Sequence, residues 1–598
     1  MTDRFAPKVS IVIPVYNGSA FVNDAIESAL CQTYKNLEVV VVNDGSSDGG
    51  RTDEAVRRFG SRVRYFSKPN GGCASALNLG LEKMRGEYFS WLSHDDLYHP
   101  EKIAHQIDIL SALDDKRTIV YGPYELIDER SRSIGCVLPQ AKGSCEQLNT
   151  PLFPLMRGLI HGCSLLIAKD LFQEFGHFDE SLKSTQDYAL WFRFLRQVPI
   201  RFDERVLIKS RVHPGQGTHT IKTHPQEMDA LWSGFVKDIK PEEAAAIDGS
   251  PYRFFRNMEK FLAPIGCEEA HKLAQQSAAE ALRETKISVV IPFYNRVDWT
   301  LEAIESALRQ THRNLEIIVV DDGSTEDISP ITRLLAVDRR LRYVHQEHSG
   351  AGTARNAGVR CATGAYIAFL DSDDRFLPNK IETQLLFMEE RGSAFSHTSY
   401  YRADASCALQ QTIDTSGFRG KAYPEIIASC PIATPTVMAA TELLRRHPFP
   451  ETIGIGEDIV AWISIAEEQD IEALAEPLSI VRISAETTSG DIGKTQRGLL
   501  NIISAVLDHP VHGRNHAEIL RSLENLYALK STELQAEKQS ASASRRIGLG
   551  DRLSRPRIGG VKTYQMLFRR GLRSIEQDGV LTTSKKCIQW IRRQYAER

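Results

Sequence analysis

Three short motifs occur twice in this chain of 598 residues, each time at an offset of 278 residues. The first set is Pro14-Val15-Tyr16-Asn17, Asn43-Asp44-Gly45-Ser46 and His94-Asp95-Asp96, and the second is Pro292-Phe293-Tyr294-Asn295, Asp321-Asp322-Gly323-Ser324 and Ser372-Asp373-Asp374. A repeat of this length indicates two whole domains of one design. We call them domain 1 and domain 2, and residues kept in both are the first candidates for a functional site.

Each domain opens with the pattern of a strand, a helix and a second strand. Apolar runs at 9–13 and 287–291 predict the first strands, and runs at 37–42 and 315–320 predict the second. Unbroken apolar strands are typical of a parallel sheet that is covered on both faces. The sequence therefore predicts α/β domains whose ligands bind beyond the carboxyl ends of the strands, where the Asp-Gly-Ser motifs lie.

The chain is predicted to have four segments: domain 1 at 1–240, a helical connector at 241–284, domain 2 at 285–495 and a helical extension at 496–598. No run of 18 apolar residues and no apolar signal core occurs, so we expect a cytoplasmic protein without a spanning segment. The ten cysteines include no Cys-x-x-Cys pair, which argues against a structural zinc site and a disulfide framework.

An acidic cluster follows a predicted buried strand in each domain. In domain 2, Asp371, Asp373 and Asp374 crowd one strand end, and like charges this close repel one another unless a cation binds them. Their hard oxygen ligands suit Mg²⁺ or Mn²⁺ shared with a substrate phosphate. The alternative is a solvated N-terminal cap of a helix. Domain 1 has Ser93 in place of the first carboxylate, so its metal site is expected to be weaker or completed differently.

Two further motifs carry an acid. Asp44 and Asp322 could accept hydrogen bonds from a base or a ribose, although a turn that uses Asp and Gly for their backbone preferences is the alternative. Later in each domain an acid precedes a tryptophan by four residues, at Asp187 and at Asp458. Such an acid favours a helix N-terminus, and it could also be a general base above a ligand.

In combination and order, these motifs resemble those of family 2 glycosyltransferases, inverting enzymes of the GT-A fold that use nucleotide-diphosphate sugars. The resemblance covers about 8–220 and 286–490. It implies two GT-A domains with Rossmann-like, mainly parallel sheets, and it assigns Asp187 and Asp458 as the catalytic bases. The residues it implies for binding the nucleotide sugar are Pro14, Tyr16, Asn17, Asp44, Asp95, Pro292, Tyr294, Asn295, Asp322 and Asp371, and those for the metal, Mg²⁺ or Mn²⁺, are Asp96, His213, Asp373 and Asp374.

The two domains depart from each other in ways that bear on function. His213 corresponds to Ser484, so a phosphate or metal contact is expected in domain 1 alone, unless His213 is a surface-loop residue. The segment between the acidic cluster and the base is 90 residues long in domain 1 and 83 in domain 2. Since this region is expected to face the acceptor, we predict two acceptors and two successive linkages. The alternative is that only domain 2 is catalytic, while domain 1 binds glycan or serves as a scaffold.

The C-terminal segment 545–598 contains 14 Lys/Arg and 4 Asp/Glu. Its interleaved apolar residues are typical of helices that bind anionic membranes, where a lipid-linked acceptor would be presented; solvated helices are the alternative. The resemblance thus implies assembly of a surface polysaccharide (lipopolysaccharide, O-antigen or capsule) at the inner face of the plasma membrane. Binding of nucleic acid is not expected. An oxidoreductase is excluded, since no Gly-x-Gly-x-x-Gly loop follows the first strand.

Overall fold

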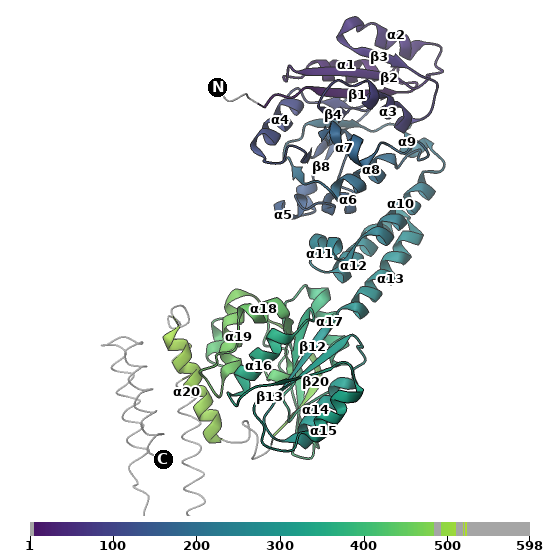
Figure 1. The fold of residues 1–598 in the computed structure, drawn as a ribbon. Helices are drawn as coiled ribbons and strands as arrows, with labels where there is room; N and C mark the ends of the chain where they lie inside the picture. Colours follow the sequence, from purple (N-terminus) through teal and green to yellow (C-terminus); the bar gives the residue numbers. More distant parts are fainter. Residues whose placement is uncertain (1–4, 484–491, 510–517, 519–520, 523–598) are drawn as a thin grey trace, which may run out of the picture. The chain divides into compact units, whose positions relative to one another are not determined.

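A computed structural model describes residues 5–483, 492–509, 518 and 521–522 (Figure 1). The chain divides into two compact units, Met1–Ala281 and Leu282–Arg598, which contain domain 1 and domain 2 and are described separately. The segment boundaries given above stay predictions.

Domain 1 is built on a five-stranded sheet in the order β3-β2-β1-β4-β9. Its strands are β1 (Val9–Val15), β2 (Leu37–Asn43), β3 (Arg64–Ser67), β4 (Tyr88–Trp91) and β9 (Ile167–Ala168). The first four are parallel and β9 is antiparallel to β4. All residues of β1 and β4 are buried, as expected for central strands covered on both faces.

Smaller sheets complete domain 1. They consist of β10 (Ile200–Phe202) paired with β6 (Ile119–Tyr121), and of β5 (Leu97–Tyr98), β11 (Ile208–Arg211), β7 (Tyr124–Ile127) and β8 (Ser133–Val137) in that order. The helices are α1 (Val22–Leu30), α2 (Arg51–Arg57), α3 (Cys73–Lys83), α4 (Lys102–Ala112), α5 (Cys145–Leu148), α6 (Phe153–Met156), α7 (Lys169–Phe175), α8 (Gln186–Leu195) and α9 (Gly217–Thr220).

Domain 2 repeats this plan in one sheet of nine strands, ordered β14-β13-β12-β15-β19-β17-β20-β16 with β18 paired to β17. They are β12 (Ile287–Phe293), β13 (Leu315–Asp321), β14 (Leu341–His345), β15 (Tyr366–Phe369), β16 (Arg375–Phe376), β17 (Phe395–Ala403), β18 (Leu409–Ile413), β19 (Met438–Ala440) and β20 (Glu472–Arg482). The register is also repeated: Val9 pairs with Leu37 and Tyr88, and Ile287 pairs with the equivalent residues of β13 and β15.

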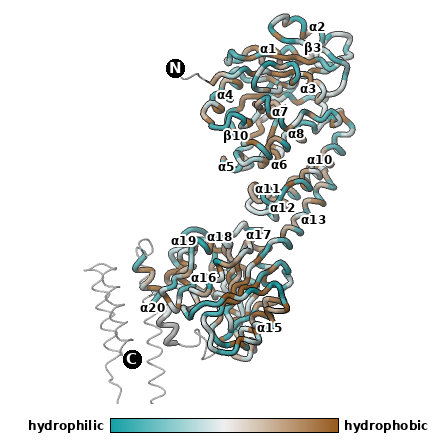
Figure 2. The backbone as a smooth tube through the Cα atoms, in the orientation of Figure 1, coloured by the Kyte–Doolittle hydropathy of each residue, from teal (hydrophilic) through white to brown (hydrophobic). Residues whose placement is uncertain are grey.

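The helices of domain 2 are α14 (Val297–Leu308), α15 (Ser329–Val337), α16 (Ala351–Cys361), α17 (Lys380–Arg391), α18 (Thr441–Arg446), α19 (Glu457–Glu468) and α20 (Ile492–Asp508). Figure 2 shows the most hydrophobic backbone along the central strands of each domain. Helix α3 packs on this core through Gly80, where an added Cβ would lie 2.3 Å from Val12 Cγ1; Gly358 of α16 lies equally close to Val290. Each glycine thus fixes its helix against the first strand.

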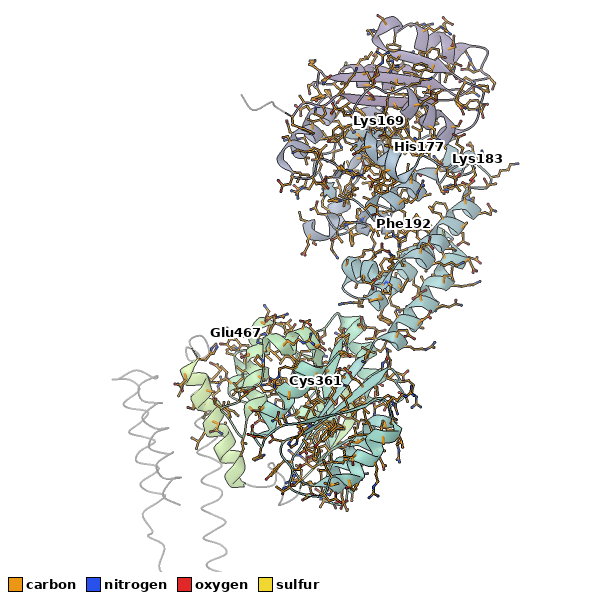
Figure 3. All side chains as sticks on the ribbon, viewed as in Figure 1. Lys169, His177, Lys183, Phe192, Cys361 and Glu467 are labelled. Carbon is orange, nitrogen blue, oxygen red and sulfur yellow. The ribbon has the colours of Figure 1, made fainter. Side chains whose placement is uncertain are left out.

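The segment that precedes domain 2 is helical, as predicted. It comprises α11 (Pro241–Asp248), α12 (Pro251–Leu262) and α13 (Glu268–Glu284), and α10 (His224–Asp238) immediately precedes it. The ring of Phe235 on α10 stacks on that of Phe192 of α8, a residue labelled in Figure 3, with the ring centroids 4.2 Å apart, and Arg196 pairs with Glu243 of α11 at 2.6 Å. Helices α10 and α11 therefore pack against domain 1.

The C-terminal extension is described only in part. Helix α20 begins the predicted helical stretch, and buried Ile503 and Val506 pack it into domain 2. The basic segment 545–598 lies outside the described residues. Within the described part of the chain, no helix is long and apolar enough to cross a membrane, and the nine described cysteines are unpaired.

Candidate active site

The loops after the first two strands are tied together in the same way in both domains. Asn17 and Asn295 have left-handed backbone conformations, with φ of 49° and 57°. The Asn17 N–H donates to Ser46 Oγ at 2.9 Å, and its side-chain oxygen accepts from the Ser47 N–H at 2.8 Å. Asn295 makes the equivalent bonds with Ser324 and Thr325. The predicted nucleotide-binding asparagines thus hold the Asp-Gly-Ser loop in place and leave Tyr16 and Tyr294 exposed beside it.

Asp44 is buried at the carboxyl end of β2, against the N-terminus of α3. Its carboxylate accepts the backbone N–H groups of Gly71 at 3.0 Å and Gly72 at 2.7 Å, and Lys68 Nζ lies 2.8 Å away. A carboxylate can accept about four hydrogen bonds, so capacity remains for a ligand. Asp44 is therefore a hydrogen-bond acceptor held in a fixed position, and Lys68 neutralises its negative charge.

Asp322 occupies the same place in domain 2 with different partners. It accepts the N–H groups of Ser349 and Gly350, at 2.9 and 2.8 Å, and the side-chain amide of Gln346 at 2.7 Å. His348 Nδ1 lies 2.9 Å from its Oδ2, and the His348 ring stacks on Tyr294 at 4.0 Å. The two domains therefore surround the same carboxylate with different side chains.

In domain 1 the acidic cluster brings together two residues that the sequence places 118 positions apart. His213 follows β11, and its Nε2 atom lies 3.0 Å from Asp95 Oδ2. A carboxylate oxygen suits Mg²⁺ or Mn²⁺, and an imidazole nitrogen is a common ligand of divalent transition metals. Asp95 and His213 thus fit a divalent cation.

Asp96, next in the chain, has a different environment. It is buried, and its Oδ1 accepts the backbone N–H of Arg211 at 2.9 Å, which fixes β11 beside the cluster. Burial, and then the nearby negative charge of Asp95, raise the pKa of Asp96 to about 7. His161 and Cys163 lie beside it, and the three ligand atoms are all within 4.8 Å of one another. These three residues could also hold a metal, with softer ligands than Asp95 and His213.

In domain 2 an arginine faces the equivalent carboxylate. Arg296 Nη1 lies 3.0 Å from Asp373 Oδ2. The equivalent position in domain 1 is Gly18, where an added Cβ would lie 2.3 Å from the His94 ring. Asp374 repeats the role of Asp96, since its Oδ1 accepts the N–H of Arg482 at 2.8 Å. Ser484, the counterpart of His213, lies outside the described residues.

The predicted base of domain 1 lies close to the other site carboxylates. Asp187 is in the first turn of α8, and burial raises its pKa to about 6. Cys73, the first residue of α3, lies within electrostatic reach of three acids: burial, and then the negative charges of Asp187, Asp44 and Asp95, raise the pKa of its thiol to about 12. The structure therefore gathers three predicted site residues around the N-terminus of one helix.

The predicted base of domain 2 has a charged neighbourhood. Asp458 Oδ2 accepts the hydroxyl of Thr434 at 2.7 Å. Buried Arg355, on α16, bonds Glu457 Oε1 at 2.6 Å and Asp371 Oδ1 at 2.7 Å. Burial alone would lower the pKa of Arg355, but the negative charges of Asp371, Glu457 and Asp458 outweigh burial and raise it. One predicted site carboxylate, Asp371, thus shares a guanidinium with Glu457, which was not predicted as a site residue.

The tryptophans that follow the bases belong to the core. Trp191 is fully buried against Phe178, with ring centroids 5.6 Å apart, and Trp462 is buried against Phe449 at 5.5 Å. They anchor α8 and α19, so each base is fixed by the packing of the helix that carries it. In this pattern the acid is half-buried in the first turn of the helix, and the aromatic residue anchors the helix in the core.

Comparison with known proteins identifies the family. The sequence profile described as "Glycosyl transferase family 2" matches residues 10–171 and 288–451, together more than half of the chain. The chain belongs to this family. It is a glycosyltransferase that acts on nucleotide sugars, with two family 2 regions, and the fold class predicted from the sequence is confirmed.

Relatives of this family 2 enzyme include a Rickettsia felis protein named "Uncharacterized glycosyltransferase", 46% identical over 98% of both chains. An Escherichia coli protein, "UDP-Glc:alpha-D-GlcNAc-diphosphoundecaprenol beta-1,3-glucosyltransferase WfaP", is 34% identical over 30% of this chain and 69% of its own length. A solved structure of a mannosyltransferase from Pyrobaculum calidifontis, in complex with GDP-Man and Mn²⁺, matches with 21% identity and a TM-score of 0.32, over 46% of this chain and 74% of that one.

Several residues at the two sites of this family 2 enzyme were not predicted from sequence. In domain 1 they are Lys68, His161 and Cys163, and in domain 2 they are Arg296, Gln346, His348, Arg355 and Glu457. None is kept in both domains, so a search for repeated residues passes over them. They could have been found by looking for differences between the domains, that is, for a polar residue of one domain that aligns with a different side chain in the other.

Proposed function

We propose that both domains transfer a sugar from a nucleotide-diphosphate sugar to an acceptor hydroxyl, with inversion at the anomeric carbon. The observation that carries this proposal is that Asp187, Asp44 and Asp95 all lie within electrostatic reach of Cys73 at the start of α3. A single displacement needs a group that binds the nucleotide, a group near the diphosphate and a base. Asp44, Asp95 and Asp187 are proposed for these three roles, in that order. Tyr16 and Tyr294, exposed beside Asp44 and Asp322, would lie against the nucleotide.

Asp187 and Asp458 are the proposed bases. The carboxylate takes the proton of the acceptor hydroxyl while the acceptor oxygen forms a bond to the anomeric carbon. The bond from that carbon to the phosphate oxygen breaks on the opposite face, and the nucleoside diphosphate leaves with the electron pair. A carboxylate whose pKa is raised to about 6, as in Asp187, is ionised at neutral pH and remains a competent proton acceptor.

A divalent cation is proposed for domain 1, held by Asp95 and His213. When bound, Mg²⁺ or Mn²⁺ would neutralise charge that develops on the departing diphosphate. Asp96 was predicted as a metal ligand. We propose instead that it orients β11, since its carboxylate is buried and accepts a hydrogen bond from the Arg211 N–H. In domain 2, Arg296 places a fixed positive charge at Asp373, and Asp374 is proposed to hold β20 as Asp96 holds β11.

The acceptor is proposed to be a lipid-linked glycan in the assembly of a surface polysaccharide. The relative WfaP supports this class by its name, which specifies a diphosphoundecaprenol acceptor and a UDP-glucose donor. Two different acceptors are proposed because the segments between cluster and base differ in length. A second candidate keeps catalysis in domain 2 alone, and Ser93, in place of a carboxylate, favours it.

The test uses the full chain as wild type, Asp187→Asn, Asp458→Asn and the double variant. Each is incubated with a panel of nucleotide sugars, Mg²⁺ or Mn²⁺ and a lipid-linked acceptor extract, and nucleoside diphosphate release and product mass are measured. Asp108→Asn and Asp470→Asn, exposed acids away from the sites, are matched controls. Loss of a different addition in each single variant supports two transferases. Loss of all transfer in Asp458→Asn alone supports the second candidate, and full activity of the double variant refutes both bases.

A further inference from the structure

The proposed nucleotide site of domain 2 differs from that of domain 1 in one aromatic contact. His348, which follows β14, stacks its ring on the exposed Tyr294, with the ring centroids 4.0 Å apart and 27° between the ring planes. The equivalent residues of domain 1, at the offset of 278, are Asn70 and Tyr16. Because asparagine has no ring, Asn70 cannot stack on Tyr16 in this way. The difference lies beside the tyrosine that is proposed to contact the nucleotide.

Both domains hold this position by the same bond to the backbone. Asn70 Nδ2 donates to the backbone carbonyl oxygen of Asp44 at 3.0 Å, and His348 Nδ1 lies 3.0 Å from the backbone carbonyl oxygen of Asp322. A carbonyl oxygen only accepts hydrogen bonds, so Nδ1 of His348 is the nitrogen that carries the hydrogen. The two domains therefore share this anchor and differ in the side chain that the anchor positions.

The imidazole of domain 2 also lies against the carboxylate of Asp322. His348 Nδ1 is 2.9 Å from Asp322 Oδ2, which already accepts the N–H of Gly350 at 2.8 Å. Asp322 Oδ1 accepts the N–H of Ser349 and the side-chain amide of Gln346. A carboxylate has room for about four donors, so His348 stands at the last open place on Asp322.

Asp44 of domain 1 keeps that place open. Its Oδ2 accepts the N–H of Gly72 at 2.7 Å, and its Oδ1 is contacted by the N–H of Gly71 at 3.0 Å and by Lys68 Nζ at 2.8 Å. Among the described residues, three donors thus surround this carboxylate, whereas four surround its counterpart in domain 2. The fourth place is the one that a ligand N–H can take in domain 1 and that His348 takes in domain 2.

A nucleobase needs the same two contacts that His348 makes. A base is a flat ring that stacks on aromatic side chains, and uracil and guanine carry a ring N–H that can donate to a carboxylate. His348 presents a flat ring to Tyr294 and an N–H to Asp322, so a base cannot make both contacts while this histidine stays in place. Since 56% of the His348 side chain is exposed, its ring can turn into solvent without disturbing the core.

We propose that His348 is an affinity-determining residue of domain 2: its side chain occupies the place of the nucleobase, and a nucleoside diphosphate binds only after the imidazole has left. This inference rests on the proposed role of Tyr294 and Asp322 in binding the nucleotide. Apparent affinity falls in proportion to the fraction of molecules whose site is open, so a ring in place in about nine-tenths of the molecules weakens binding about tenfold. Domain 2 therefore needs more nucleotide sugar than its other contacts would require.

The first experiment measures nucleotide binding to the full chain by titration calorimetry, with one site silenced at a time. Asp44→Ala leaves the site of domain 2, and Asp322→Ala leaves that of domain 1. The titrants are UDP, GDP, CDP, dTDP and ADP, with Mn²⁺ present. In the Asp44→Ala chain, His348→Asn should tighten binding of the preferred nucleotide about tenfold, because the anchor is kept and the ring is lost. In the Asp322→Ala chain, Asn70→His should weaken binding about tenfold.

A second exposed histidine nearby supplies the matched control. The side chain of His345, the last residue of β14, is 57% exposed, and its Nδ1 faces Asp321 at 3.4 Å. His345→Asn should leave nucleotide affinity unchanged, and an equal gain in this variant would trace the effect to lost charge and overturn the proposal. His348→Asn in the otherwise wild-type chain should tighten one of two binding events, independently of Asp44→Ala. Unchanged binding in His348→Asn would also overturn the proposal, and so would weaker binding, which would make His348 a stacking partner of the base.

A second measurement follows the His348 ring itself. In the full chain labelled with ¹³C-histidine, the His348 resonance is identified by its loss in His348→Asn, and the ring current of Tyr294 should shift it upfield in the absence of nucleotide. Added nucleotide should move it to the position of a solvent-exposed histidine, and a resonance already at that position would overturn the proposal. If no nucleoside diphosphate binds any chain, the proposed function fails and this inference fails with it. Binding that His348→Asn does not tighten refutes this inference alone.

Discussion

The Nε2 atom of His213 lies 3.0 Å from Oδ2 of Asp95, although the two residues are separated by 118 positions. The contact joins the end of β11 to the acidic cluster. In domain 2 the equivalent carboxylate faces Arg296 instead, and the position of His213 is taken by Ser484 in the sequence. The two domains thus place different side chains, a histidine and an arginine, beside equivalent carboxylates.

We expect His213→Ser to weaken Mn²⁺ binding by domain 1 at least about tenfold, because one of two converging ligands is lost. The measurement is a Mn²⁺ titration of the full chain with UDP, followed by electron paramagnetic resonance. His177→Ser, an exposed histidine of the same domain (Figure 3), should bind Mn²⁺ as the wild type does. Unchanged Mn²⁺ affinity in His213→Ser would remove this residue from the metal site.

Substitutions of Asp96 and of Asp95 should have different effects: those of Asp96 on the stability of domain 1, and those of Asp95 on Mn²⁺ binding. Asp96→Ala leaves the buried N–H of Arg211 without an acceptor, so the free energy of unfolding of domain 1 should fall by about 1–3 kcal/mol. Asp96→Asn keeps an acceptor oxygen and should lose less. Asp95→Asn should weaken Mn²⁺ binding while unfolding near the wild-type temperature. Urea unfolding and Mn²⁺ titration of the three variants decide this, and weaker metal binding in Asp96→Asn than in Asp95→Asn would reverse the assignment.

Asp187 makes the stability of domain 1 depend on pH. Its folded-state pKa, about 6, lies above the ordinary value of 3.8, because burial disfavours the charge. Stability from the protonated form is therefore present below pH 4 and lost as pH rises through about 6. Asp187→Asn stays uncharged, so domain 1 should unfold at a higher temperature than wild type at pH 8 and at a similar temperature at pH 4. Calorimetry with Asp108→Asn as the control checks this, and a difference independent of pH would contradict it.

The repeat made much of the fold predictable. Strands β1, β2, β12 and β13 appear in the sequence as mainly apolar runs, and the Asp-Gly-Ser loops lie at the carboxyl ends of β2 and β13, as parallel topology requires. The second and third carboxylates of the domain 2 cluster, Asp373 and Asp374, were found because domain 1 keeps them as Asp95 and Asp96. What repetition could not predict is the partner of each carboxylate.

Those partners come from distant positions and are set by packing. His161 and Cys163 reach Asp96 only because β9 pairs antiparallel with β4, a short two-residue pairing with no distinctive sequence pattern. Arg355 is one arginine among many in the sequence, and its burial between two acids depends on the close approach of α16 and α19 at Gly352. The metal role of Asp96 was predicted from the family resemblance, and its backbone contact with Arg211 depends on the placement of β11 between β5 and β7.

The last prediction concerns the glycines that seat α3 and α16 on the first strands. At Gly80 an added Cβ would lie 2.3 Å from Val12 Cγ1, and at Gly358 it would lie 2.4 Å from Val290 Cγ1, so alanine must displace the helix that carries the site. Gly80→Ala and Gly358→Ala should each lower the free energy of unfolding of their own domain by about 1–3 kcal/mol. Gly234→Ala on α10, where nothing lies within 4 Å, should instead stabilise by about 0.5–1 kcal/mol, since glycine is a poor helix former. Val12→Ala combined with Gly80→Ala should recover part of the loss, because it removes the clashing methyl groups. Denaturant unfolding of the four chains measures this, and a neutral Gly80→Ala would show that α3 is not held by this contact.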